Sequence, residues 1–154
     1  MEVEKLRVYA DTSVFGGCFD VEFETASEQF FLEVREGRFV LVVSDLTVEE
    51  LADAPENVRS VLQGLGTEQV ERVRSTPECE ALRLAYLEAG ILGPASAEDA
   101  LHIAIATVME VDMVVSWNFK HIVHFEKIAG FEGVNAVRKY RSPRIYSPRE
   151  VIEQ

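Results

Sequence analysis

The most informative segment of the sequence is Leu6-Arg7-Val8-Tyr9-Ala10-Asp11-Thr12-Ser13-Val14-Phe15-Gly16-Gly17. In its first half, Leu6 to Ala10, side chains of different character alternate, and β-branched and aromatic residues are among them. This pattern predicts a β-strand rather than a helix. The strand pattern stops at Asp11, which is followed by two hydroxyl side chains and soon by a pair of glycines. Open α/β sheets bind ligands beyond the carboxyl ends of their strands. We therefore expect Asp11 at such an end, where other segments of the chain can bring further functional groups.

Two more apolar runs, residues 39–43 and 113–115, have the character of strands buried on both faces of a parallel sheet. Segments with helical spacing alternate with them, at residues 22–36, 47–51, 56–65, 77–89, 97–110 and 119–128, and Gly130 is read as the end of the last helix. Residues 68–74 fit a strand or a helical turn, and residues 144–146 predict at most a short edge strand. This alternation predicts one domain over residues 1–154, a three-layer α/β/α sandwich with a mainly parallel sheet.

The composition excludes several classes of protein. Hydrophobic residues make up 47% of the 154 residues, which is enough for a sizeable core and too many for a disordered chain. The apolar runs are too short to span a bilayer, and the N-terminus shows no secretory signal. Cys18 and Cys79 lack the spacing of a metal site, so we expect both to be buried and reduced. A cytoplasmic location, away from any membrane, is the expectation that follows.

The chain carries a formal charge of −12, with 27 acids against 15 Lys and Arg. A free protein this acidic repels a polyanion at long range. It is therefore not expected to bind nucleic acid unless clustered carboxylates hold divalent cations or a basic partner protein is present. One basic stretch, from Arg138 to Arg149, contains no acid. It fits either a solvated edge strand and loop or a surface that contacts phosphate.

Three further polar residues occupy positions comparable to that of Asp11. Glu50 follows the second predicted strand, Asp99 stands in the first turn of the helix at 97–110, and Asn118 follows the third strand. Taken singly, Glu50 and Asp99 also fit helix-capping patterns, because each lies three residues after a Thr or Ser. Together, carboxylates at one sheet edge would repel one another unless cations lay between them. Oxygen ligands suit Mg²⁺ or Mn²⁺, which can activate a water for phosphodiester hydrolysis.

These segments resemble the successive signatures of a PIN domain, in the same order, over residues 6–122. The resemblance is carried by Asp11-Thr12-Ser13-Val14, Ser44 with Glu50-Leu51, Asp99-Ala100-Leu101-His102-Ile103-Ala104-Ile105-Ala106, and Ser116-Trp117-Asn118. It implies a PIN-like fold and a metal-dependent endoribonuclease in which a metal-activated water cleaves RNA, with Mg²⁺ or Mn²⁺ as the cofactor. Many PIN domains are toxins of VapC-type toxin–antitoxin pairs, so the implied partners are RNA, an antitoxin protein and a second copy in a homodimer.

Carried over by position, Asp11, Glu50 and Asp99 match the acidic metal ligands of the family. They are the expected catalytic residues, together with Asn118. The family's fourth acid, usually an Asp in a Thr-x-Asp context, falls on Asn118. An Asn can ligate a metal or orient a water through its carbonyl oxygen, but it supplies no charge. PIN-like sequences with a similar Ser-Trp-Asn-Phe-Lys-His segment form a subgroup, which this chain resembles. Because Asn118 supplies no charge, the resemblance leaves open whether one or two metal ions bind.

Candidates for substrate binding are the polar side chains next to these acids: Thr12, Ser13, Ser116 and His121. Thr12 and Ser13 fit a hydrogen bond to a phosphate or metal-bound water as well as a role in stabilising the turn. His121 follows Asn118 closely enough to contact a phosphate. By contrast, His102 is interpreted as a core or capping histidine, and Trp117 as a packing residue rather than a base-stacking platform.

Two other functions are alternatives to the nuclease. A PIN-like domain that binds RNA or a protein without cutting is favoured by Asn118 and by the acidic charge, and a Mn²⁺ titration separates it from an active nuclease. A phosphatase of the aspartyl-phosphate kind needs a second acid two residues after its nucleophile. Ser13 stands at that position, which disfavours this function.

Overall fold

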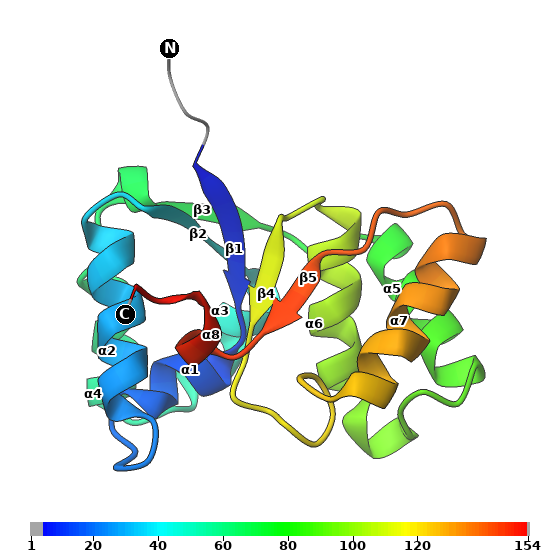
Figure 1. Cartoon of the computed structure of the whole chain (residues 1–154), viewed down its shortest axis with the longest axis horizontal. Coiled ribbons are helices and arrows are strands. Elements are labelled where there is room, and N and C mark those ends of the chain that lie inside the picture. The colour runs from blue at the N-terminus through cyan, green and yellow to red at the C-terminus, as the bar shows by residue number, and fades with distance from the viewer. Residues whose placement is uncertain (1–4, 154) are drawn as a thin grey trace.

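The computed structural model describes residues 5–153, and a five-stranded sheet runs through its middle (Figure 1). The strands are β1 (Leu6–Ala10), β2 (Phe39–Ser44), β3 (Val70–Val73), β4 (Met113–Val115) and β5 (Arg144–Tyr146). Their order across the sheet is β3-β2-β1-β4-β5, and every pairing is parallel. Parallel neighbours need crossover connections, and helices supply them here.

Helices cover both faces of the sheet. They are α1 (Thr12–Gly17), α2 (Glu24–Arg35), α3 (Asp45–Ala52), α4 (Glu56–Gln63), α5 (Pro77–Glu88), α6 (Ala97–Val108), α7 (Phe125–Val137) and α8 (Pro148–Val151), with 3₁₀ turns η1 (Thr67–Gln69) and η2 (Pro94–Ser96). In Figure 1, α1, α2, α4 and α8 lie to the left of the sheet, and α5, α6 and α7 lie to the right. The molecule therefore has three layers, in the order helix, sheet, helix.

The two faces of the sheet form two separate apolar cores because successive side chains of a strand point in opposite directions. Val8 and Ala10 of β1 pack with α1 and α2, whereas Tyr9 packs with α5, α6 and α7. All three of these side chains are fully buried. Burial on both faces explains why the central strands have apolar sequences without a polar face.

The three predicted strands and most of the predicted helices are present. Residues 68–74, which fitted a strand or a helical turn, hold the end of η1 and then β3, and residues 144–146 form the edge strand β5. Cys18 and Cys79 are buried and unpaired within the described residues, as expected. No helix within residues 5–153 combines the length and the apolar character that crossing a bilayer requires.

The helix predicted at residues 119–128 is present only from Phe125 onward, so its predicted start and end are both wrong. Residues 119–124 form turns, and α7 begins at Phe125, where the His124 side chain accepts a hydrogen bond from the backbone N–H of Glu126 at 3.2 Å. Gly130 does not end a helix but lies inside α7. A Cβ atom at this position would stand 2.9 Å from Cγ1 of Ile91, so the glycine allows α7 to pack closely against the segment that follows α5.

Candidate active site

The candidate site lies at the carboxyl ends of β1 and β4, the two neighbouring strands at the centre of the sheet. After β1 the chain continues into α1 on one face, and after β4 it leads to α7 on the other. Such a point, where the crossovers diverge, is the usual ligand crevice of an open α/β sheet. The structure places Asp11 immediately after β1 and Ser116 immediately after β4.

Asp11 is buried and tightly held. Its side chain is 4% exposed, and its carboxylate accepts hydrogen bonds from Ser13 Oγ at 2.5 Å and Ser116 Oγ at 2.7 Å. Burial raises the pKa of the Asp11 carboxyl, the charge of His102 and the two serine hydroxyls oppose this shift, and the negative charge of Asp99 adds to it. The net result is that the charged form of Asp11 is disfavoured relative to an exposed carboxylate.

The two serines connect Asp11 to the loop that follows β4. Ser13 Oγ accepts the backbone N–H of Trp117 at 2.9 Å, and Ser116 Oγ accepts that of Asn118, also at 2.9 Å. Both hydroxyl protons point to Asp11. In this structure Ser13 and Ser116 therefore orient the carboxylate and the loop, and any contact with substrate stays a prediction.

Glu50 reaches the site from α3. Its Oε1 atom accepts a hydrogen bond from Thr12 Oγ1 at 2.6 Å and lies 2.7 Å from His102 Nε2. Burial raises the pKa of Glu50, but the hydrogen bond and charge of His102 and the Thr12 hydroxyl outweigh it, so the pKa lies below its ordinary value. Glu98 lies close by, and its hydrogen bond with Glu50 raises the pKa of Glu98. Negative charges are thus crowded at this end of α6.

Neither Glu50 nor Asp99 takes part in the helix-capping pattern that its sequence allows. The N-cap of α3 is Ser44, whose side chain accepts the backbone N–H of Thr47, so Glu50 lies well inside the helix. Ser96, at the start of α6, makes no side-chain capping hydrogen bond. The capping alternative is therefore wrong in its simple form for both acids.

His102 is a site residue that sequence reasoning missed. The residue is buried, as a core histidine would be, but its ring joins two polar groups: Nδ1 lies 2.6 Å from the Tyr9 hydroxyl and Nε2 contacts Glu50. The Tyr9 hydroxyl in turn lies 2.7 Å from Ser44 Oγ. A buried hydrogen-bond chain thus runs from Ser44 through Tyr9 and His102 to Glu50, and we call it the Tyr9–His102 chain. In the sequence, the position of His102 one helical turn after Asp99 was the feature that could have indicated its place at the site.

Asp99 and His121 form a pair at the rim of the site. Asp99 Oδ2 lies 3.1 Å from His121 Nδ1, and both side chains are 27% exposed. His121 belongs to the loop after β4, so this contact ties the loop to the first turn of α6. Asp99 is nearer to solvent than Asp11, yet its charge is close enough to affect the Asp11 carboxyl.

Asn118 holds the same loop. Its Oδ1 atom accepts the backbone N–H groups of Lys120 at 3.2 Å and of His121 at 2.9 Å. Two backbone donors occupy both lone pairs of the oxygen that was expected to assist a metal. The structure thus gives Asn118 a role in shaping the turn, which sequence reasoning missed.

The donor set has the chemistry of a site for a hard divalent cation. Asp11, Glu50 and Asp99 offer only carboxylate oxygens, which Mg²⁺ and Mn²⁺ prefer. Within residues 5–153, no three His, Cys, Asp or Glu side chains are arranged so that they form a metal-binding group by themselves. Mg²⁺ does not require one, because it is usually held by one or two carboxylates with waters and substrate phosphate. The residues therefore fit such an ion by donor type.

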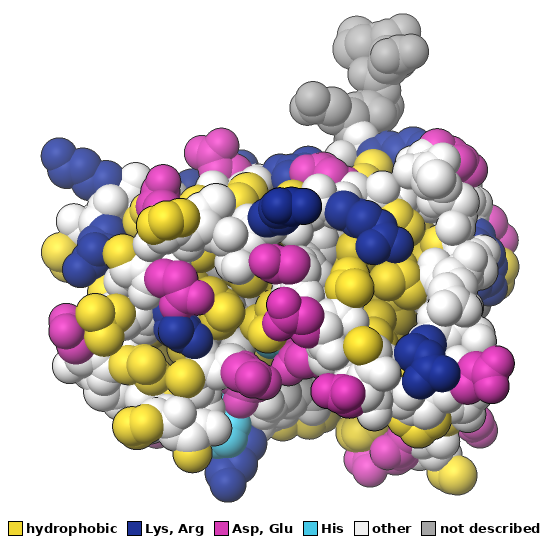
Figure 2. Space-filling model, turned by 180° about the vertical axis from the view of Figure 1, so that it is seen from behind, with side chains coloured by type: hydrophobic (Ala, Val, Ile, Leu, Met, Phe, Trp, Pro, Cys, Tyr) yellow, Lys and Arg dark blue, Asp and Glu magenta, His cyan; other side chains and the backbone are white. Residues whose placement is uncertain are grey.

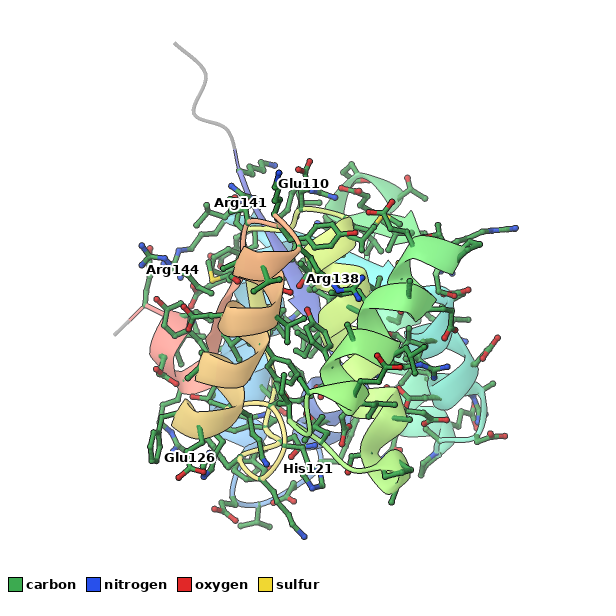
Figure 3. The ribbon with its side chains drawn as sticks, turned by 90° about the vertical axis from the view of Figure 1, so that its right-hand side faces the viewer. Glu110, His121, Glu126, Arg138, Arg141 and Arg144 are labelled. Atoms are coloured by element: carbon green, nitrogen blue, oxygen red, sulfur yellow. The ribbon has the colours of Figure 1, made fainter. Side chains whose placement is uncertain are left out.

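The charged surface around the site is uneven. Figure 2 shows Asp and Glu side chains running down the middle of the back face toward its lower part, the end at which the strands point. Arg138, Arg141 and Arg144 of the basic stretch lie in the upper part of the molecule in Figure 3, and His121 lies at the bottom. Arg141 donates to the backbone oxygen of Glu110, ahead of β4. Most of the basic stretch is therefore remote from the candidate site.

Comparison with known proteins supports the fold. No protein-family model matches the chain, and no curated protein matches its sequence. Among solved structures, the chain is similar to one in the crystal structure of DNA-bound VapBC from Salmonella typhimurium, with 21% sequence identity and a TM-score of 0.53. The match covers 93% of this chain and 98% of that chain. A match at this low identity establishes the fold alone. The structural similarity confirms the predicted PIN-like α/β/α architecture with a parallel central sheet.

Proposed function

We propose that this chain is a metal-dependent endoribonuclease that hydrolyses RNA phosphodiester bonds. The observation that supports the proposal is that three carboxylates lie toward the carboxyl edge of the sheet. Asp11 follows β1, Glu50 of α3 accepts a hydrogen bond from neighbouring Thr12, and Asp99 lies in the first turn of α6, where its charge affects Asp11. Asp11, Glu50 and Asp99 would hold Mg²⁺ or Mn²⁺. Such an ion, when bound, would stabilise charge on the phosphate and make a water more acidic.

The neighbouring residues would keep these carboxylates in fixed orientations. Two serine hydroxyls restrain Asp11, and Thr12 and His102 restrain Glu50. Ligands held by such outer contacts lose little conformational freedom when a cation binds. His121 would orient Asp99 and, through its partly exposed ring, contact a phosphate of the RNA.

We further propose that the chain acts in the cytoplasm as the toxin of a type II toxin–antitoxin pair. The similar solved structure is described as a VapBC complex, which supports this context. A charge of −12 favours an antitoxin with a basic surface. A homodimer is the expected assembly of the free chain, and light scattering after size-exclusion chromatography would measure it.

The test compares RNA cleavage by the parent chain with that of two site variants, Asp11→Asn and Asp99→Asn. Single-stranded RNA is incubated with Mn²⁺ or Mg²⁺, and with excess chelator. We expect cleavage by the parent in metal, none in chelator, and none by either variant. Glu132→Gln, which removes an exposed acid on α7, is the matched control and should cleave like the parent. Cleavage that persists in chelator, or in the double variant, would refute the proposal.

A second function has one observation in its favour. The Asn118 oxygen is occupied by backbone N–H groups, and three-residue metal groups are absent from the described part of the chain. A PIN-like module that binds RNA or a protein without cutting would have these features. Isothermal titration with Mn²⁺ separates the two: a nuclease shows binding that Asp11→Asn abolishes, and a binding module shows no heat of metal binding.

A further inference from the structure

Beside the acidic crevice lies a group of three aromatic side chains, Phe23, Trp117 and Phe119, which we call the aromatic cluster. The rings of Phe23 and Trp117 are stacked, with centroids 4.2 Å apart and planes 19° apart. Phe119 meets Trp117 edge-on at 6.1 Å. Trp117 follows Ser116, which bonds Asp11, so the cluster adjoins the site through the backbone of the loop after β4.

Trp117 is the fixed base of the cluster. It is only 6% exposed, and its indole N–H donates to Ser27 Oγ at 2.8 Å. A Cβ atom on Gly17 would lie 2.7 Å from Nε1 of Trp117, so the glycine provides the space for the indole against α1. These contacts agree with the interpretation of Trp117 as a packing residue, since little of its surface is left for a ligand.

Phe119, unlike the buried Trp117, is 45% exposed. It is nevertheless held in place by the turn to which it belongs. Its backbone N–H bonds the carbonyl of Trp117 at 3.0 Å, and the next two N–H groups bond the side chain of Asn118. His121 then ties the end of the turn to Asp99. A ring that remains exposed on a restrained turn is preorganised to bind a flat partner, because little conformational entropy is lost on contact.

Positive charges flank the aromatic cluster in a chain that is acidic as a whole. Lys120, which follows Phe119, is exposed, and the guanidinium of Arg149 lies over Trp117 at 5.4 Å from the ring centre. Arg149 is thus the member of the basic stretch that contacts the aromatic cluster. Aromatic platforms bordered by cations are the features with which proteins bind single-stranded nucleic acid.

We propose that Phe119 stacks on a nucleobase of the RNA substrate next to the scissile phosphate, while Lys120 and Arg149 pair with flanking phosphates. This inference rests on the proposed nuclease function and adds a base-binding subsite to it. Stacking requires an unpaired base, because the bases of an A-form duplex are already stacked and their edges lie in grooves. The subsite should tolerate any base, since each base presents a π-face.

Binding is measured in Mg²⁺, which offsets the acidic charge of the site, and in the Glu50→Gln background, which removes one expected catalytic acid so that the RNA stays intact. The probe is a fluorescein-labelled ten-nucleotide RNA in single-stranded and duplex form. Trp117 is the only tryptophan in the chain, so its emission reports contact with the aromatic cluster. We expect the single strand to quench this emission, and Phe119→Ala to weaken its binding by about fivefold or more, the effect of losing one stacked base. Phe119→Leu should weaken binding similarly, whereas Phe119→Tyr should retain it.

Phe125→Ala is the matched control, because Phe125 is an exposed aromatic residue outside the cluster and its loss should leave RNA affinity unchanged. Unchanged affinity in Phe119→Ala, rescue by Phe119→Leu, or equally tight binding of the duplex would overturn the inference. So would a Phe119→Ala variant that binds RNA normally but loses self-association, since Phe119 would then belong to an interface between copies. If Phe119 governs binding but the parent never cleaves RNA in Mn²⁺, the subsite stands and the nuclease proposal fails.

Discussion

Replacing Tyr9 by Phe removes a single oxygen atom from the middle of the Tyr9–His102 chain. That oxygen lies 2.6 Å from His102 Nδ1 and 2.7 Å from Ser44 Oγ, inside a fully buried region. The ring remains, so no large cavity forms. Two lost hydrogen bonds at about 0.5–1.5 kcal/mol each, and the added cost of an unpaired histidine nitrogen, predict a loss of about 2–3 kcal/mol in the free energy of unfolding.

The assay is urea unfolding followed by circular dichroism, with thermal melting as a second measure. For a chain of this size, about 2–3 kcal/mol corresponds to a fall of roughly 4–12 °C in Tm. Tyr86→Phe is the matched control, because the Tyr86 hydroxyl donates to Asn135 Oδ1 at 2.6 Å in the same core, away from the acids. Both variants should lose stability, but Tyr9→Phe alone should also weaken Mn²⁺ binding, since His102 would no longer orient Glu50.

Two results would refute this reasoning. If Tyr9→Phe unfolds at the same urea concentration as the parent, the buried chain does not stabilise the fold. If Tyr86→Phe weakens Mn²⁺ binding as much as Tyr9→Phe does, the effect comes from lost stability and not from the orientation of Glu50.

Three further predictions concern other parts of the molecule. Burial raises the pKa of Asp11 above 3.8, so the ionised carboxyl destabilises the folded state at neutral pH. Metal-free Asp11→Asn should therefore melt at the parent's Tm or higher near pH 7, and any gain in Tm should shrink as the pH falls toward 3.8. A clear loss of Tm at pH 7 would contradict this. For buried Glu33, burial raises the pKa, but hydrogen bonds from Gln29, from the backbone of Glu153 and from Arg38 outweigh it and lower the pKa below 4.5. Glu33→Gln should therefore lower the free energy of unfolding, measured in urea at pH 7, by about 1.5–3 kcal/mol. The difference in stability between parent and variant should diminish below pH 4.5, and a difference that does not change with pH would exclude a charge effect. Gly17→Ala places a Cβ atom 2.5 Å from Ser27 Oγ, so it should destabilise the fold by about 1–3 kcal/mol and alter Trp117 emission, and an unchanged melt and spectrum would contradict the packing described.

The strands were predictable from the sequence because the centre of a parallel sheet is apolar on both faces. Residues 39–43 and 113–115 therefore form unbroken apolar runs, and these runs alone indicate buried strands. The start of α7 was not predictable, because it depends on turns that the Asn118 side chain stabilises and on capping by His124. Gly130 was misleading, since a glycine required for close packing against Ile91 has the same sequence signal as one that ends a helix.

The places of Asp11 and Asp99 in the fold were predictable, because Asp11 follows a strand and Asp99 stands in the first turn of a helix. Glu50 lies inside α3, and the catalytic role of all three acids stays a prediction. The hydrogen-bond partners of these acids were not predictable. Tyr9 and His102 are 93 positions apart, and nothing in the local pattern of either residue indicates that a phenol and an imidazole meet. The role of Asn118 was also hidden, because an amide that binds backbone N–H groups and one that binds a metal occupy the same place in the sequence.

The placement of β1 has a consequence for synthesis on the ribosome. β1 is made first, but Val8 pairs with Met113 of β4, and this partner emerges roughly 5–20 s later at ordinary rates of translation. During that interval the nascent chain can complete only the β3-β2-β1 half of the sheet, and one side of β1 stays open to pairing with other chains. A chain interrupted before β4 would keep that open side permanently and should aggregate or be degraded.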